Sequence, residues 1–288
     1  MKEHPFSITN PDRRGILEVE VFISGASGFL GRNLLAHFSE VEGFGSKAIA
    51  RSSEADSISS LLRASSATKK VIILNGWGGV FTSEQENSQL QSESLELFKT
   101  QVTEGLAAGA DMIIGIGTQA EYRKFAGQPD SLDYRSAKLA ASKYLREKAT
   151  AYGIPVHWVR LFSIYGNGMD KRWLLPKLVE ASTSGLPLRL GPCSQMWGFL
   201  HVSDAARAIE LVVRGSVENY VIDLGGEASE TLRCQIEGLR DLLPGLKVSF
   251  EPGDAPQDSV PNLAPLLAAG WRSEISLDLG VRELIEKS

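Results

Sequence analysis

A phenol and an ammonium group are spaced four residues apart in the segment that begins at Tyr134. On a helix, Tyr134 and Lys138 would lie one turn apart, so both side chains can project from the same face into a cleft. A nearby cation lowers the pKa of a phenol from about 10, which would fit Tyr134 for proton transfer near neutral pH. The same spacing also occurs on solvated helix faces. Thr118 favours the catalytic interpretation, because it follows the apolar run 113–117 and parallel sheets place their sites at the carboxyl ends of strands.

Three glycines form a tight turn between a predicted strand and a predicted helix near the start of the chain. Glycines let the backbone come close to a diphosphate, and a helix N-terminus offers unpaired N–H groups and the positive end of its dipole. The turn therefore predicts a dinucleotide site, with a plain structural turn as the alternative. The candidate cofactor-binding residues here are Gly25, Ser27, Gly28, Phe29, Leu30 and Gly31.

The end of the second predicted strand indicates which dinucleotide is bound. An acidic side chain at this place binds the ribose 2′-hydroxyl of NAD, whereas an arginine accommodates the 2′-phosphate of NADP. Here Arg51 and Ser52 follow the strand. A guanidinium and a hydroxyl suit a phosphate through charge-assisted hydrogen bonds, so NADP(H) is preferred and NAD(H) stays open. The alternative for Arg51 is a solvated surface residue.

A second glycine-containing turn follows the predicted strand 71–74. Asn75, Gly76 and Trp77 are expected to line the nicotinamide site, since glycine permits close approach of the backbone. A simple strand-ending turn is the alternative.

Apolar runs typical of buried strands alternate with helical patterns through the first two thirds of the chain. Strands are expected at 19–24, 47–50, 71–74, 112–116, 156–161 and 220–224, and helices at 94–108 and 134–152. This alternation predicts the α/β class, with a Rossmann-like doubly wound parallel sheet. Few residues separate Arg51 from Val71, so the strand that usually lies there is expected to be short or missing.

The composition of the chain changes after Gly166, where Gly- and Pro-rich loops alternate with short predicted helices and strands. Residues 1–166 are predicted to form mainly the NAD(P)-binding domain, to which residues 199–224 return. Residues 167–198 and 225–288 are predicted to form a smaller C-terminal substrate-binding subdomain.

The composition argues against several classes of protein. The chain has 288 residues, of which 43% are hydrophobic and 23% charged, as in an ordinary globular protein. A net charge of −5, with basic residues scattered singly, argues against nucleic acid and membrane partners. Cys193 and Cys234 have no metal-ligand spacing around them, so no metal is expected. We recognise neither a leader nor a membrane-spanning stretch, and therefore predict a cytoplasmic location.

These motifs together resemble the extended short-chain dehydrogenase/reductase family, also called the NAD-dependent epimerase/dehydratase family. The resemblance covers nearly the whole chain and includes the segments 160–166, 199–204 and 269–271. It implies that hydride passes between a nicotinamide and a sugar carbon. It also implies a homodimer formed through the helices 94–108 and 134–152.

The resemblance assigns roles to the candidate catalytic residues. Tyr134 would be the general acid/base, Lys138 would bind the nicotinamide ribose and tune Tyr134, and Thr118 would hydrogen-bond the reacting oxygen. Leu161 joins the cofactor-binding candidates, because it lies in the matching segment 160–166.

The chain departs from the family at positions that bear on the substrate. Dehydratases of the family place an acidic pair directly after the position of Thr118, where Gln119 and Ala120 stand here, so dehydration is not expected. Ser163 replaces the family's usual asparagine, and one contact to the substrate or cofactor should differ accordingly.

The segment with Gln195 and Trp197 has tryptophan where many epimerases carry an arginine. It resembles the 4-ketoreductases that act on nucleotide-linked 4-keto-6-deoxysugars, with simple packing of Trp197 as the alternative. Arg189 is a candidate for binding a diphosphate, although an isolated basic residue is usually solvated. The substrate candidates are Thr118, Gln119, Ser163, Arg189, Gln195 and Trp197.

The leading hypothesis is NADPH-dependent reduction of a nucleotide-diphosphate-linked 4-keto-6-deoxysugar to the 4-hydroxy sugar, with Tyr134 protonating the oxygen. One alternative is a nucleotide-sugar epimerase that holds NAD permanently. Another is a non-catalytic NADP-binding regulator, which would need no intact set of Thr118, Tyr134 and Lys138.

Overall fold

The computed structural model describes residues 18–50, 57–81, 84–122, 133–254 and 257–287. In this part of the chain, six strands form one parallel sheet in the order β2-β1-β3-β4-β5-β10. The strands are β1 (Val19–Ser24), β2 (Phe44–Ile49), β3 (Lys69–Leu74), β4 (Met112–Thr118), β5 (Val156–Leu161) and β10 (Val221–Leu224). A parallel sheet is normally covered on both faces, and the inner strands β3 and β4 accordingly contain buried apolar runs, whereas the edge strand β2 is mixed.

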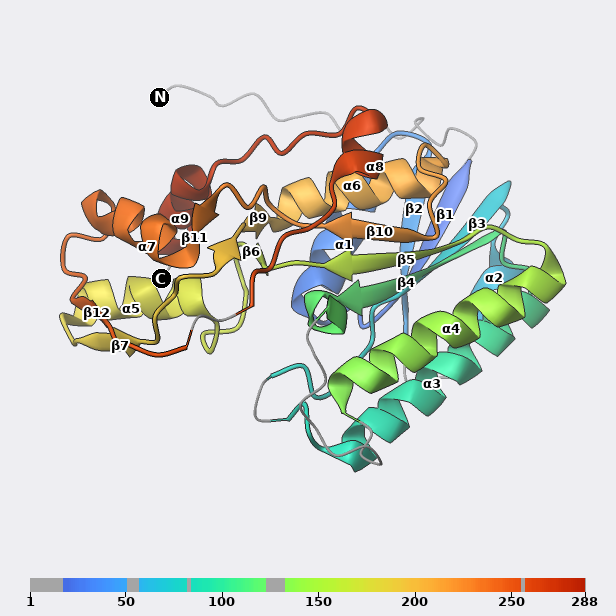
Figure 1. Ribbon diagram of the computed structural model, residues 1–288. Helices are drawn as coiled ribbons and strands as arrows, with labels where there is room; N and C mark the ends of the chain where they lie inside the picture. Colours follow the sequence, from blue (N-terminus) through green and yellow to red (C-terminus); the bar gives the residue numbers. More distant parts are fainter. Residues whose placement is uncertain (1–17, 51–56, 82–83, 123–132, 255–256, 288) are drawn as a thin grey trace, which may run out of the picture.

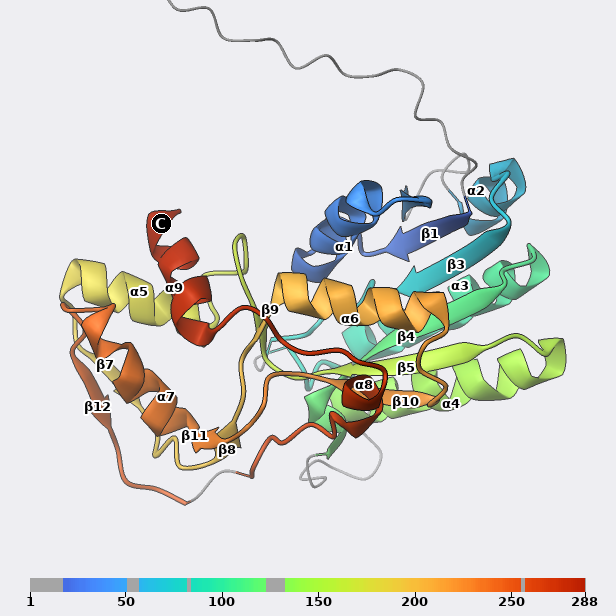
Figure 2. The ribbon, with the colours of Figure 1, turned by 90° about the horizontal axis from the view of Figure 1, so that it is seen from above.

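Helices cover both faces of the sheet (Figures 1 and 2). Successive side chains of a strand point to opposite faces. Val21 and Ile23 therefore pack into the core on the side of α1 (Phe29–Glu40) and α6 (Val202–Arg214). Phe22 lies in the other core, which is formed with α2 (Ile58–Ala64), α3 (Ser88–Ala107) and α4 (Tyr134–Tyr152). The predicted doubly wound α/β fold is confirmed.

The strand order reverses next to β1, because β2 lies on one side of it and β3 on the other. Open sheets of this kind bind ligands in the crevice outside the carboxyl ends of the strands, at such a switch point. The loops after β1 and β3 are therefore the place where the fold itself predicts a ligand.

The connection between β2 and β3 is short. Its described part, residues 57–68, contains the helix α2 and no strand. The prediction that the usual strand is short or missing therefore agrees with the described residues.

A third hydrophobic core lies beyond the carboxyl ends of the sheet strands (Figure 1). It joins Leu178 of α5 (Leu174–Ser184), Ile236 of α7 (Leu232–Gly238) and Leu284 of α9 (Leu277–Glu286). The remaining elements are η1 (Gln119–Tyr122), β6 (Ile164–Tyr165), β7 (Leu188–Leu190), β8 (Met196–Trp197), β9 (Leu200–His201), β11 (Glu230–Thr231), η2 (Leu239–Asp241), β12 (Val248–Phe250) and α8 (Ala264–Ala268). The boundaries of the substrate-binding subdomain stay a prediction.

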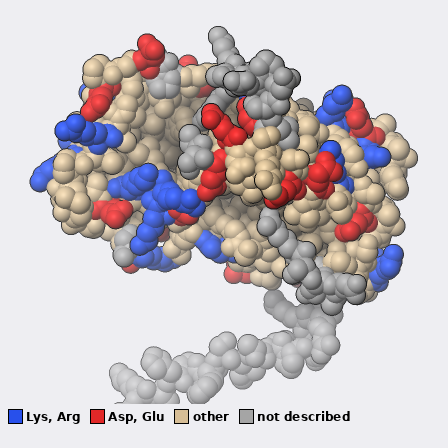
Figure 3. Space-filling view, turned by 90° about the horizontal axis from the view of Figure 1, so that it is seen from below, with Lys and Arg blue, Asp and Glu red and all other residues tan. Residues whose placement is uncertain are grey.

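On the face in Figure 3, several Lys and Arg side chains lie together on the left part of the molecule, and Asp and Glu side chains lie beside them and nearer the middle. Among the described helices, none combines the length and the apolar composition needed to cross a bilayer.

Candidate active site

A cavity of about 770 Å³ opens at the switch point between β1 and β3. Its lining brings together eight of the predicted cofactor-binding residues, from the two turns that follow these strands. They are Gly25, Ser27, Gly28, Phe29, Leu30, Asn75, Gly76 and Trp77. Gly28 is the N-cap of α1, and the structure shows no side-chain hydrogen bond capping this end. The first N–H groups of α1 are therefore suited to bind a pyrophosphate.

The glycines of the first turn are required by close contacts. Gly25 has φ +64°, and a Cβ there would lie 2.8 Å from the backbone of Gly76. Gly31 does not line the cavity, because it faces the turn: a Cβ on Gly31 would overlap the carbonyl oxygen of Gly25. Gly31 thus allows α1 to pack directly against the turn that leads into it.

Gly31→Ala should lower the free energy of unfolding by about 1–3 kcal/mol, because the added methyl group pushes α1 away from the turn. Urea denaturation would measure the change. Gly238→Ala is the matched control, since a Cβ at Gly238 meets open space at the end of α7 and should have little effect. Equal stability of the two variants would contradict the prediction.

Ser24, which the sequence analysis did not single out, links the two turns that line the 770 Å³ cavity. Its buried hydroxyl oxygen accepts hydrogen bonds from the N–H groups of Asn75 and Gly76, both at 3.1 Å. Trp77 donates its Nε1–H to Oε1 of the buried Gln91 at 2.9 Å. The only sequence signal for Ser24 was a small polar residue at the end of an apolar strand.

Three other cofactor predictions are not confirmed at this cavity. Arg51 and Ser52 lie outside the described residues, so the preference for NADP stays a prediction. Leu161 ends β5 and packs, partly buried, against the core on the α1 side rather than lining the 770 Å³ cavity.

Tyr134, Lys138 and Thr118 come together at the carboxyl end of β4. Asp133 caps α4 by accepting a hydrogen bond from the N–H of Ser136 at 2.6 Å, so the helix begins at Tyr134. Tyr134 is buried and hydrogen-bonded to Thr118. Lys138 is also buried, and its Nζ donates to the carbonyl oxygen of Ile116 at 2.7 Å.

The structure corrects one expectation about these residues. The pKa of Tyr134 is raised to about 12, mainly by burial; the hydrogen bond to Thr118 opposes this shift, and the charge of Glu121 contributes to it. Burial also lowers the pKa of Lys138 to about 7, against the opposing effect of Glu121. The expectation that Lys138 lowers the pKa of Tyr134 is wrong for this structure. The ammonium lies 5.8 Å from the centre of the phenol ring but only 4.0 Å from that of Trp77, and near neutral pH it is close to losing its charge.

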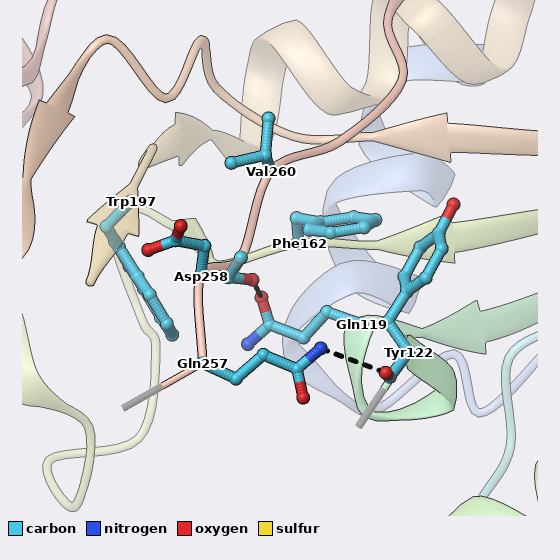
Figure 4. Close-up of a pocket in the computed structure, with 8 residues that line it drawn as sticks. Gln119, Tyr122, Phe162, Trp197, Gln257, Asp258 and Val260 are labelled. Atoms are coloured by element: carbon cyan, nitrogen blue, oxygen red, sulfur yellow. Dashed lines mark hydrogen bonds between the residues drawn. The ribbon is translucent and has the colours of Figure 1, made fainter. Parts of the chain in front are cut away.

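A smaller cavity of about 160 Å³ adjoins this site (Figure 4). Trp197 stands on one side of it and Tyr122 on the other, with Gln119 between them. The side-chain oxygen of Gln119 accepts hydrogen bonds from the hydroxyl groups of Ser259, at 2.7 Å, and of Ser163, at 3.5 Å. Gln119 directly follows Thr118 in the chain, but Thr118, Tyr134 and Lys138 do not themselves line this cavity.

The other substrate candidates differ in their surroundings. Ser163 has φ +33°, a conformation that asparagine and glycine adopt more readily than serine. Gln195 is buried, and its Oε1 has no hydrogen-bond partner among the described residues. Arg189 is exposed on β7, 3.7 Å from a carboxylate oxygen of Glu251, and does not line the 160 Å³ cavity.

A polar network behind the smaller cavity was missed by the sequence analysis. Tyr122 donates its hydroxyl to Oδ2 of Asp223 at 2.8 Å, and Arg160 donates its Nε–H to Oδ1 of the same carboxylate at 2.8 Å. Burial, followed by the bond to Asp223, raises the pKa of Tyr122 to about 12. A lone aspartate in the apolar strand 221–224 was the only available signal.

Comparison with known proteins gives a consistent picture. The family model described as the NAD dependent epimerase/dehydratase family matches residues 21–225. A probable dTDP-glucose 4,6-dehydratase of Sinorhizobium fredii is 23% identical over 220 residues, which are 71% of this chain and 61% of that protein. A UDP-2-acetamido-2,6-beta-L-arabino-hexul-4-ose reductase of Pseudomonas aeruginosa is 23% identical over 211 residues, which are 70% of this chain and 52% of that protein. The chain thus spans less than two thirds of each of these relatives.

Solved structures share the fold over most of the chain. A UDP-glucose 4-epimerase of Thermus thermophilus in complex with NAD superposes with a TM-score of 0.74 at 17% identity, covering 93% of this chain and 98% of that one. RMD of Pseudomonas aeruginosa, complexed with NADPH, superposes with a TM-score of 0.75 at 19% identity and the same coverage. At these identities the likeness concerns the fold alone.

Proposed function

The chain belongs to the NAD-dependent epimerase/dehydratase family, and we propose that it reduces the keto group of a nucleotide-diphosphate-linked 4-keto-6-deoxysugar with NADPH. The observation that carries this proposal is the meeting of Thr118, Tyr134 and Lys138 at the carboxyl end of β4. Tyr134 is a buried, protonated phenol there.

The cavity at the switch point fits a dinucleotide. The N-terminus of α1 faces it without a side-chain cap, and Gly25 and Gly76 approach so closely that a side chain at Gly25 would not fit. The turn 25–31 would hold the pyrophosphate, and the turn 75–77 would lie against the nicotinamide half. A bound NADPH would supply the hydride.

The high pKa of Tyr134 favours reduction over oxidation as the first step. Reduction of a keto group creates an alkoxide, which is a much stronger base than a phenolate, so a phenol with a pKa of about 12 can donate its proton. An epimerase must begin by removing a proton from a hydroxyl group, and for this Tyr134 would have to be ionised. Thr118, hydrogen-bonded to Tyr134, would hold the same substrate oxygen.

The smaller cavity supports a sugar as the substrate. Trp197 offers an apolar surface there, and Gln119 offers an amide beside Thr118. Neither Gln119 nor Ala120 is acidic, so the pair expected for dehydration is missing. The Pseudomonas aeruginosa relative, whose name describes a hexul-4-ose reductase, agrees with this proposal.

Incubation with NADPH and a panel of CDP-, dTDP-, GDP- and UDP-linked 4-keto-6-deoxysugars tests the proposed function. We expect loss of NADPH absorbance with one of them. If no member of the panel causes oxidation of NADPH, the proposal is overturned and an epimerase is favoured. The UDP-glucose 4-epimerase of Thermus thermophilus, which shares the fold, binds NAD. An epimerase should carry bound NAD after purification.

Arg51→Ala should weaken NADPH binding about 10- to 100-fold and leave NADH binding nearly unchanged, because the variant loses a charge-assisted contact with the 2′-phosphate. Isothermal titration would measure both affinities. Arg63→Ala, which removes an exposed arginine of α2, is the matched control. Equal loss for NADPH and NADH would contradict NADP specificity.

We also propose a cytoplasmic homodimer. Leu139 and Tyr152 of α4 are large side chains exposed by 39% and 54%, which agrees with an interface on this helix pair. Light scattering would measure the mass in solution, and a monomer would contradict the proposal.

A further inference from the structure

A buried carboxylate lies directly beneath the proposed catalytic residues. Glu121, in η1, is only 8% exposed and does not line the 160 Å³ cavity. Its Oε1 accepts hydrogen bonds from the backbone N–H of Thr118 at 2.9 Å and from Nε1–H of Trp158 at 3.0 Å. Its Oε2 lies 3.1 Å from the same indole nitrogen. A carboxylate buried in this way requires partners, and here an indole and a backbone amide provide them.

The glycines of β4 make room for this arrangement. A Cβ on Gly115 would lie 2.5 Å from the ring of Trp158, and a Cβ on Gly117 would lie 2.6 Å from Oε1 of Glu121. Two glycines within a central strand weaken it, which indicates that close approach of other groups is needed there. Gly115, Gly117, Glu121 and Trp158 therefore form one packed unit.

The same unit faces the ammonium of Lys138. The hydrogen bond from Nζ goes to the uncharged carbonyl of Ile116, and the rings of Trp77, Tyr134 and Trp158 surround it, with centres at 4.0, 5.8 and 6.0 Å. The negative charge of Glu121 favours the ammonium form of Lys138. Burial raises the pKa of Glu121, whereas its hydrogen bonds to Thr118 and Trp158 and the charges of Lys138 and Arg160 lower it and so favour the carboxylate. Without a compensating charge, burial of an ammonium favours its neutral form.

We infer that Glu121 is a positioning residue of this site: its carboxylate fixes the backbone of Thr118 and keeps the side chain of Lys138 in its ammonium form. The inference rests on the proposed roles of Thr118 and Lys138 in cofactor binding and reduction. It assigns a task to a residue that touches neither the substrate cavity nor the dinucleotide cavity.

The pH dependence of NADPH binding tests this inference without any sugar substrate. Binding through the ammonium of Lys138 should weaken as the pH rises through the pKa of that group, which is about 7. Glu121→Gln keeps the size of the side chain and an oxygen that accepts both hydrogen bonds, but it removes the charge. We expect the weakening to begin about one pH unit lower in this variant. Cofactor fluorescence would give the affinity at each pH.

Two further variants complete the test. Trp158→Phe removes the indole donor and therefore raises the pKa of Glu121. It should shift the pH profile of NADPH binding in the same direction as Glu121→Gln, but by less. This variant provides the test if Glu121→Gln does not fold. Glu147→Gln, at an exposed position of α4, is the matched control and should give the wild-type profile.

Superposition of the Glu121→Gln and Trp158→Phe profiles on the wild-type profile would overturn the inference. If the pH profile of NADPH binding shifts in these variants but the wild-type protein turns over no keto sugar, the proposed function alone is contradicted. If the wild-type protein reduces a keto sugar but the profiles of the variants do not shift, the role of Glu121 alone is contradicted.

Discussion

Tyr134→Phe should lower the rate of reduction by about 10²- to 10⁴-fold, because it removes the general acid that we propose for the substrate oxygen. The phenyl ring fills nearly the same buried space, so the fold should persist. The loss should appear in kcat rather than in cofactor affinity, since the phenol acts on the reacting oxygen. Steady-state kinetics with the active keto sugar would measure the effect.

The control for this variant is Tyr144→Phe. Tyr144 lies on the same helix, and its hydroxyl is 3.0 Å from that of Thr103 on the exposed side. This change should leave turnover within about twofold of wild type, as surface substitutions usually do. A Tyr134→Phe variant that retained full turnover would show that another group, or water, delivers the proton.

Lys138→Met should abolish turnover and yet raise the free energy of unfolding by about 1–3 kcal/mol at pH 7 and below. A buried ammonium is destabilising unless it is well compensated, and an apolar side chain of similar length can fill the same space. The lost hydrogen bond to Ile116 and the contact with Trp77 offset part of the gain. Urea denaturation would measure the difference.

The stability gained in Lys138→Met should decrease as the pH rises above 7. The pKa of Lys138 is about 7 in the folded protein, against an ordinary value of 10.5. Between these values the unfolded chain binds more protons, so the stability of the wild-type protein rises with pH across this window. The advantage of Lys138→Met should therefore shrink as the pH increases from 7 towards 10. A gain that is constant with pH, or a loss of stability, would show that Lys138 is not buried as an ammonium.

Much of the fold was predictable because its signals are local. The predicted ranges 19–24, 156–161 and 134–152 coincide with β1, β5 and α4. Strands buried on both faces are rich in apolar residues, and α4 begins after a capping aspartate and ends before Gly153, which has the left-handed conformation. Predictions were less accurate where the pattern was mixed: β2 begins at Phe44 rather than at residue 47, and α3 begins at Ser88, six residues before the expected start.

The glycine turn, the one-turn spacing of Tyr134 and Lys138, and the order of the strands along the chain could all be predicted from the amino-acid sequence. These features depend on neighbouring residues and on helix geometry. The hydrogen bond of Trp158 to Glu121, which spans 37 residues, and that of Tyr122 to Asp223, which spans 101, became visible only in the folded chain. The tertiary structure also decided the directions in which the pKa values of Tyr134 and Lys138 move. The physical reason is desolvation, which depends on every group that covers a side chain, and those groups come from distant parts of the chain.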